Sequence, residues 1–90
     1  MYYVYLIISK KNNNLYVGCT KDLRKRLEEH NSGKSFYTKG KGPWEVRYYE
    51  AFFFKDDAFQ REKQLKRHKR GMIELKKRIE KSLNGGGQEL

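Results

Sequence analysis

The 90-residue chain carries 21 lysines and arginines against 11 acidic residues, a formal net charge of +10 at pH 7. This length supports one domain with a thin core, the single cysteine excludes an internal disulfide, and no apolar run approaches the ~20 residues of a membrane-spanning helix. The charge favours nucleic acid as partner, with an anionic membrane surface as the second candidate and mere solubility as the plain alternative. We expect a cytoplasmic protein that binds nucleic acid, without membrane association or a small-molecule cofactor.

The first two predicted elements are strands. Residues 2–9 form a near-continuous β-branched and aromatic run, which is typical of a central strand covered on both faces. The Asn-rich segment 10–14 predicts a turn and residues 15–20 a second strand, so the pair forms a hairpin. Alternation puts Tyr5 on one face of the first strand and Tyr16 with Gly18 on one face of the second. The two tyrosines could therefore lie side by side.

Helices and a third strand complete the pattern. Thr20 or Asp22 can cap a helix over about 22–31. The later elements are a Lys/Gly-rich loop over 33–43, a strand over about 44–54, a helix capped by Asp56 or Asp57 and running to about Arg70, a break at Gly71, and a helix over about 72–83. The order β-β-α-β-α-α predicts an α+β domain over residues 1–84, a small antiparallel sheet with helices packed on it, and a flexible tail over 85–90.

Glu62 is out of place in the second of these helices. Ala58, Phe59 and Leu65 mark its inward stripe, and Glu62 lies three or four residues from each of them, so it points the same way. An ionised carboxylate there needs a partner. Two alternatives stay open: a metal ion, or a structural ion pair with an arginine of the first helix or a nearby lysine.

Arg26 and His30 are four positions apart and so rise on one helical face. A guanidinium binds the non-bridging oxygens of a phosphate in bidentate fashion, and an imidazole can orient a water, donate to phosphate or relay a proton near neutral pH. The alternatives are a solvated helix charge for Arg26 and a residue favoured by the helix dipole for His30.

Other residues are candidates for binding a nucleic-acid strand. The loop alternates basic and aromatic side chains, which suits binding a phosphate backbone while stacking on bases, although an exposed mobile loop would look the same. Gly18 permits close approach of a ligand to the backbone, or else marks a bulge. The candidate nucleic-acid-binding residues are Gly18, Arg24, Lys34, Tyr37, Lys39 and Lys41.

Two short motifs, Tyr3-Val4-Tyr5 and Tyr16-Val17-Gly18, carry a family resemblance, with their tyrosines Tyr5 and Tyr16 eleven positions apart. Together with the stretch 16–33 and the segment 61–66, they make the chain to about Ser82 resemble the GIY-YIG nuclease superfamily. The match is to its stand-alone, single-domain branch of uncharacterised proteins. The resemblance implies the GIY-YIG endonuclease fold, a three-stranded antiparallel sheet flanked by helices, and metal-dependent cleavage of DNA phosphodiester bonds.

The resemblance also implies roles for five residues. Tyr5 and Tyr16 would be the motif tyrosines, and Tyr16 or a water that it contacts would activate the nucleophile. Arg26 would stabilise the charge on the phosphorus centre, and His30 would assist at the nucleophile or phosphate. Glu62 would hold one Mg²⁺ or Mn²⁺ ion, which coincides with its unusual position in the helix.

Three departures from the family pattern bear on activity. Tyr3 stands at the leading glycine of the first signature, Cys19 at a lysine found in some members, and Glu74 at an asparagine found in several. Weak or structure-restricted cleavage, on branched or single-stranded DNA, is therefore one expectation. The alternative from another class is a nucleic-acid-binding module without catalysis, and a further one is dependence on a protein partner that supplies specificity.

Overall fold

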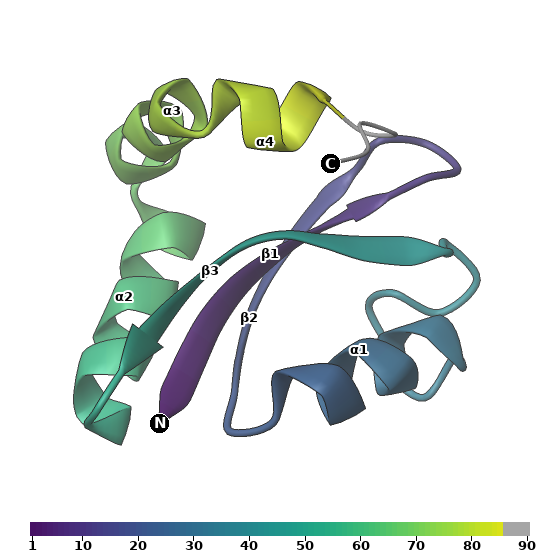
Figure 1. Ribbon diagram of the computed structural model, residues 1–90, viewed down its shortest axis with the longest axis horizontal. Helices are drawn as coiled ribbons and strands as arrows, with labels where there is room; N and C mark the ends of the chain where they lie inside the picture. Colours follow the sequence, from purple (N-terminus) through teal and green to yellow (C-terminus); the bar gives the residue numbers. More distant parts are fainter. Residues whose placement is uncertain (86–90) are drawn as a thin grey trace.

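The computed structural model describes residues 1–85 and folds them into a small sheet flanked by helices (Figure 1). The strands are β1 (Tyr2–Ser9), β2 (Leu15–Thr20) and β3 (Trp44–Phe52). The helices are α1 (Leu23–Asn31), α2 (Lys55–Arg67), α3 (Lys69–Arg78) and α4 (Glu80–Asn84). Residues 86–90, most of the tail expected from residue 85, lie outside the described residues.

The three strands form one antiparallel sheet in the order β2-β1-β3, which confirms the expected α+β class. β1 is central because it is the strand with a continuous run of large apolar side chains, and it is buried from Val4 to Ser9. The Asn-rich segment makes the hairpin turn, where Asn13 adopts a left-handed φ of 62° that Asn tolerates. The Asn13 N–H donates to the Ser9 carbonyl at 2.8 Å and closes that turn.

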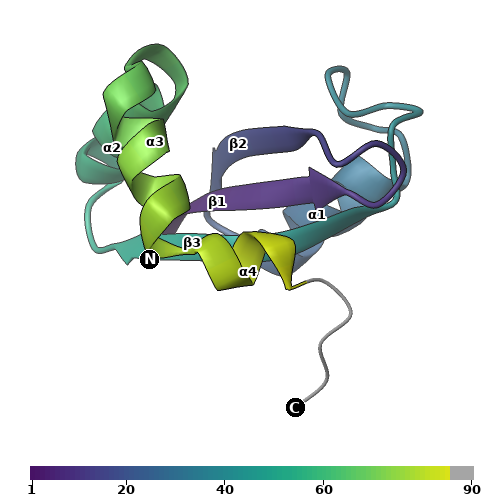
Figure 2. The same ribbon diagram turned by 90° about the horizontal axis from the view of Figure 1, so that it is seen from above.

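Helices cover both faces of the sheet, as the apolar run of β1 predicts. On one face α2, α3 and α4 pack against the strands through Val4, Leu6, Val17, Ala58, Leu65, Leu75 and Leu83. On the other face α1 packs through Tyr5, Ile7, Tyr16, Leu23, Leu27, Trp44 and Val46. Figure 2 shows α4 and α1 on opposite sides of the sheet. Each fully buried aliphatic side chain contributes about 1.5–3 kcal/mol to this packing.

The helix starts are set by different residues in α1 and α2. Asp22, one of the two expected caps, accepts a hydrogen bond from the Lys25 N–H at 3.1 Å and caps α1. The prediction that Asp56 or Asp57 caps α2 was wrong. The helix begins at Lys55, after Phe54, and both aspartates lie in its first turn. Acidic side chains there still interact favourably with the helix dipole.

The break after α2 falls at His68 and not at Gly71, which lies inside α3. His68 has an extended backbone with φ −112° and ψ 104°, and the expected helix over 72–83 is two helices separated at Ile79. The turn at His68 lets α3 and α4 fold back so that Leu75 and Leu83 reach the sheet. Their burial outweighs the roughly 1 kcal/mol that a glycine costs inside a helix.

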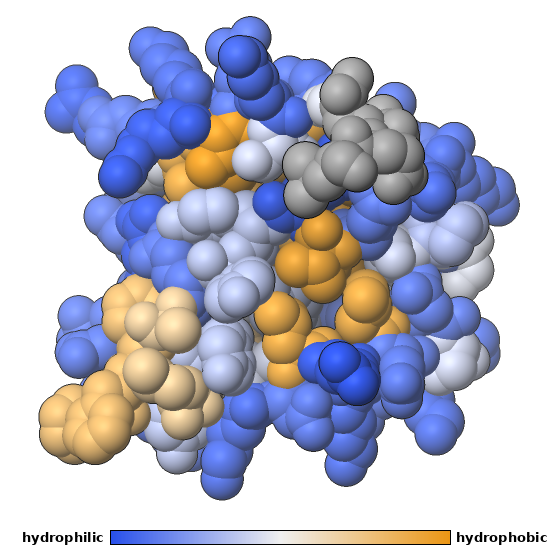
Figure 3. Space-filling view, in the orientation of Figure 1, coloured by the Kyte–Doolittle hydropathy of each residue, from blue (hydrophilic) through white to orange (hydrophobic). Residues whose placement is uncertain are grey.

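The surface in the view of Figure 1 is mainly hydrophilic, with a pale apolar patch over the connection between β3 and α2 and more strongly apolar areas near α3 and in the middle of the view (Figure 3). β3 ends at Phe52, two residues earlier than expected, so Phe53 and Phe54 lie outside the sheet and are 76% and 64% exposed. No helix among residues 1–85 has the length and apolarity that crossing a bilayer requires.

Candidate functional site

The candidate site lies along β2, which is one of the two outer strands of the sheet. Cross-strand register sets Gly18 opposite Tyr5 and Tyr16 opposite Ile7. A Cβ at position 18 would collide with the ring and hydroxyl of Tyr5, so only glycine lets this phenol lie across β2. The pairing of β1 with β2 is continuous at Gly18, so a bulge does not explain this glycine. Contact of Gly18 with nucleic acid stays a prediction.

His30 is buried at the end of α1, where it joins Tyr5 to the loop that follows. Its Nε2 lies 2.7 Å from the Tyr5 hydroxyl and its Nδ1 lies 2.7 Å from Thr38 Oγ1. The Thr38 hydroxyl donates to the Ser35 carbonyl, which can only accept. Thr38 Oγ1 therefore accepts from the Nδ1–H of His30, and Nε2 accepts from the Tyr5 O–H.

Both members of this buried pair are neutral at neutral pH. Burial first and the Arg26 cation second lower the pKa of His30 to about 4. Burial also raises the pKa of Tyr5 to about 12, although the hydrogen bond from Arg26 opposes the rise. His30 is 2% exposed and uses both ring nitrogens, so its contacts in this structure are those of a residue that orients Tyr5.

Arg26 presents a guanidinium beside Tyr5, one turn of α1 before His30. Its Nη1 donates to Glu29 Oε1 at 2.9 Å, and the side chain lies close enough to donate to the Tyr5 hydroxyl. The hydrogen bond to Glu29 raises the pKa of Arg26, which keeps it a cation. A guanidinium has five N–H donors in a planar fork, so donors beyond those two contacts can bind phosphate oxygens.

Helix α2 brings Glu62 to the same outer strand. Lys66, one helical turn further on, pairs with Glu62 at 3.0 Å and lies over the Tyr16 ring, 5.4 Å from its centroid. The Glu62 charge also contributes to the raised pKa values of Tyr5 and Cys19, for which burial is the largest cause. The carboxylate therefore lies near the two signature strands and not on the far side of the molecule.

The surroundings of Glu62 differ in part from the sequence expectation. Ala58 and Leu65 are buried as predicted, but Phe59 is 47% exposed. The apolar stripe through which α2 contacts the sheet is therefore narrower than the predicted one. The ion pair with Lys66 is one of the alternatives left open for Glu62. A partly exposed i,i+4 pair contributes only about 0.3–0.5 kcal/mol, so the carboxylate can exchange its lysine for another cation.

Glu62 is the acidic group at this edge that could hold a metal ion. Within residues 1–85 no three His, Cys, Asp or Glu side chains are grouped so as to coordinate an ion. Mg²⁺ usually keeps several waters and binds through one or two carboxylates and substrate phosphate oxygens. The single carboxylate therefore fits a hydrated ion completed by substrate, and does not fit a site made of protein ligands alone.

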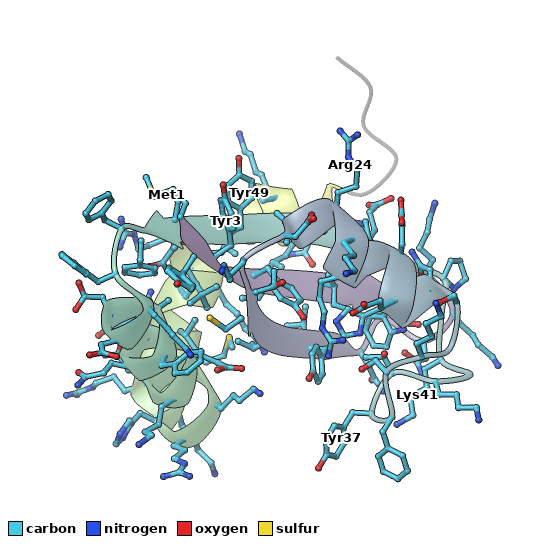
Figure 4. All side chains as sticks on the ribbon, turned by 90° about the horizontal axis from the view of Figure 1, so that it is seen from below. Met1, Tyr3, Arg24, Tyr37, Lys41 and Tyr49 are labelled. Atoms are coloured by element: carbon cyan, nitrogen blue, oxygen red, sulfur yellow. The ribbon has the colours of Figure 1, made fainter. Side chains whose placement is uncertain are left out.

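The predicted nucleic-acid contacts fall on two sides of the molecule. Tyr37 and Lys41 project from the loop between α1 and β3 on the β2 side, whereas Arg24 projects from α1 on the opposite side (Figures 2 and 4). Lys34 and Lys39 are exposed and belong to the same loop as Tyr37. Tyr37 and Lys41 therefore share a side with the candidate site, and Arg24 does not.

The two main surface hollows of the molecule do not coincide with the candidate site, which lies at an outer strand of the sheet. One surface hollow lies between the hairpin turn and α3–α4, and another lies along α2 around Gln60. Neither is lined by Tyr5, Tyr16 or Glu62. Small-molecule sites are concave and mostly apolar, so an open edge with cationic groups suits an extended anionic polymer better.

Sequence reasoning missed two residues of this site. Thr38 is fully buried and orients His30, but nothing in the Lys/Gly-rich loop distinguishes it from other polar residues. Lys66 contacts both Glu62 and Tyr16, and its i,i+4 spacing from Glu62 was the available signal.

Comparison with known proteins gives similarity over most of the chain. The family model described as the GIY-YIG catalytic domain matches residues 1–77. A UPF0213 protein of Bacillus pumilus is 40% identical over 81 residues, 86% of this chain and 83% of its own. The UPF0213 protein YazA of Bacillus subtilis is 39% identical over 72 residues, 79% of this chain and 73% of its own.

A solved structure extends the similarity to three dimensions. The solution NMR structure of a UPF0213 protein from Bacillus halodurans is 30% identical with a TM-score of 0.53, and the match covers 99% of this chain and 100% of that one. The matched regions contain all five candidate catalytic residues, from Tyr5 to Glu62.

Proposed function

Because this chain belongs to the GIY-YIG catalytic domain family, we propose that it is a divalent-metal-dependent endonuclease that hydrolyses DNA phosphodiester bonds. One observation carries the proposal. Tyr5, Tyr16, Arg26 and Glu62 come from β1, β2, α1 and α2, and all four gather at the outer edge of β2. Core packing accounts for the buried Tyr5 ring, but it gives no reason for a second phenol, a guanidinium and a carboxylate to converge beside it at one edge of the sheet.

In the proposed reaction a water oxygen bonds to phosphorus while the bond from phosphorus to one nucleoside oxygen breaks. The attacking water gives up a proton to solvent, and the nucleoside oxygen that leaves takes one up from solvent. Tyr16 orients that water by a hydrogen bond, and Arg26 binds the non-bridging oxygens on which negative charge grows. An Mg²⁺ or Mn²⁺ ion held by Glu62 would supply Lewis acidity and stabilise charge on the leaving oxygen.

His30 and Tyr5 act as positioning residues in this proposal. The neutral His30 accepts from the Tyr5 hydroxyl, which leaves the Tyr5 oxygen oriented toward Arg26. A metal ion held by Glu62 would compete with Lys66 for the same carboxylate, so Lys66 would be the group displaced. Because Lys66 lies over the Tyr16 ring, its ammonium group would stay near the phosphate of a bound substrate.

A nucleic-acid-binding module without catalysis is the second candidate. The Glu62–Lys66 ion pair favours it, because the pair neutralises the carboxylate without a metal ion. Both candidates bind an anionic strand, so binding alone does not separate them; cleavage does.

The separating experiment incubates the protein with labelled single-stranded, duplex and branched DNA, and with RNA, in Mg²⁺, Mn²⁺ or chelator. Glu62→Gln and Tyr16→Phe are compared with Glu80→Gln, an exposed position of α4, and Tyr49→Phe, on the side opposite Tyr37 (Figure 4). We expect metal-dependent cuts that disappear in the first two variants and persist in the two controls. Binding without cleavage in every condition would establish the module, and cleavage of RNA alone would change the substrate.

A further inference from the structure

We propose that Phe36 and Tyr37 form a stacking site for unpaired nucleobases, which makes the protein prefer single-stranded or locally unpaired DNA to duplex. This inference deepens the proposed function and rests on its nucleic-acid-binding part. The two rings lie edge to face, with centroids 5.4 Å apart and an angle of 84° between their planes. Phe36 is 86% exposed and Tyr37 70% exposed, so ring faces are available to a ligand.

The backbone on both sides of this aromatic pair is held firmly. Ser35 and Thr38, the residues directly before and after it, are buried, and the Thr38 N–H donates to the Ser35 carbonyl at 3.3 Å. The Thr38 carbonyl accepts from the indole N–H of Trp44 at 3.1 Å. The rings are therefore exposed although their anchors are fixed. This pre-organisation lowers the entropy lost on binding and counts against a merely mobile loop.

The charge around the pair selects the kind of ligand. Residues 33–43 contain Lys34, Lys39 and Lys41 and no acidic residue. Exposed aromatic rings among cations match a strand that carries phosphates and planar bases, and base–aromatic stacking with a basic groove is the usual mode of single-strand binding. An apolar protein surface would gain nothing from the three lysines.

A second aromatic pair in the chain shows what this charge adds. Phe53 and Phe54 are also exposed, with ring centroids 5.0 Å apart and an interplanar angle of 82°. They are followed by Lys55, Asp56 and Asp57, so their local charge is negative. They are a matched control with the same ring geometry and the opposite electrostatic surroundings.

The position of the loop links stacking to the site. Tyr37 and Lys41 project on the side where β2 is the outer strand (Figures 2 and 4), and Thr38 contacts His30 at 2.7 Å. A strand with a phosphate at Arg26 can therefore carry neighbouring bases to the two rings. In a duplex the bases are paired and stacked on one another, so their faces are not available.

The test measures binding in chelator, so that no strand is cut. The probes are a fluorescent oligonucleotide of about 15 nucleotides, a length that spans a typical single-strand site, its duplex, and an abasic strand with the same phosphates. Phe36→Ala/Tyr37→Ala is compared with Phe53→Ala/Phe54→Ala, and the emission of Trp44 with the melting temperature checks folding. A more conservative Phe36→Leu/Tyr37→Leu variant keeps apolar volume but removes the rings.

We expect the wild type to bind the single strand most tightly. Both ring-removing variants should lose roughly 5- to 150-fold of that affinity for each ring that stacks. We expect little change for the abasic strand and none for the Phe53/Phe54 control. Equal losses on all three probes, or none, would overturn the stacking site while leaving the proposed nuclease intact. A wild type that binds no nucleic acid would instead refute the proposed function.

Discussion

Replacing Gly18 with alanine is expected to destabilise the protein and to separate Tyr5 from His30. The new Cβ would lie 2.9 Å from Tyr5 Cε1 and still closer to its Cζ and hydroxyl. Tyr5 is 1% exposed and packs with Ile7 and Trp44, so its ring cannot yield without disturbing the core. Overpacking by one methyl group costs about 1–3 kcal/mol, and leaving the buried His30 nitrogen unpaired adds about 1–3 kcal/mol. We expect a total loss of about 2–6 kcal/mol.

Urea unfolding followed by circular dichroism measures this loss, and about 3 kcal/mol corresponds to a fall in Tm of roughly 12–24 °C for a domain of this size. Gly71→Ala is the control, since the nearest atom to its new Cβ would be 3.5 Å away and alanine favours the helix. In a Tyr5→Leu background, which removes the colliding atoms, Gly18→Ala should cost less than about 1 kcal/mol. A small effect in the wild-type background, or an equal effect in both, would refute the reasoning.

Three further predictions concern charge. The pKa of His30 in the folded protein is about 4, against an ordinary value of 6.5. The stability contributed by its neutral ring is therefore present above pH 6.5 and is lost as the pH falls toward 4. Urea midpoints of the wild type should drop across this window, and an equally steep drop in His30→Asn would contradict the assignment of this pH dependence to His30. Lys66→Met should raise Mn²⁺ affinity without DNA by about 1.7- to 2.3-fold, since the lysine that competes for Glu62 is gone. Paramagnetic resonance measures this affinity, and the exposed Lys63→Met should leave it unchanged. No difference between the two variants would exclude competition for the Glu62 carboxylate. Lys41→Ala should reduce the slope of log DNA affinity against log salt concentration by about 0.7–0.9, the loss of one phosphate contact. Arg24→Ala should leave this slope unchanged. A change in slope with Arg24→Ala and none with Lys41→Ala would place the DNA-binding surface on the side of Arg24.

Several features follow from local sequence and were confirmed. The continuous apolar run of β1 and the Asn-rich turn determine a central strand in a hairpin, because both signals act between neighbouring residues. Alternation along the strands put Tyr5 and Tyr16 on the same side of the sheet, where α1 packs. The i,i+4 spacing of Arg26 and His30 holds in any helix, so both reach Tyr5.

The state of each side chain at the site depended on tertiary contacts. His30 is neutral because burial removes its hydration, and the Thr38 that satisfies its second nitrogen comes from a loop whose path no local pattern predicts. The partner of Glu62 is a lysine of its own helix and not an arginine of α1, because α2 and α1 pack on opposite faces of the sheet.

The sequence by itself determined the strands, the family and the residue types of the candidate site, since these depend on pattern and spacing along the chain. Only the tertiary structure decided that α2 ends at Arg67, before the extended His68, that Gly18 makes room for Tyr5, and that Arg24 faces away from Lys41. The physical reason is one of magnitude. Local preferences amount to about 1 kcal/mol for each residue, whereas burying a large side chain against a distant segment is worth about 1.5–3 kcal/mol.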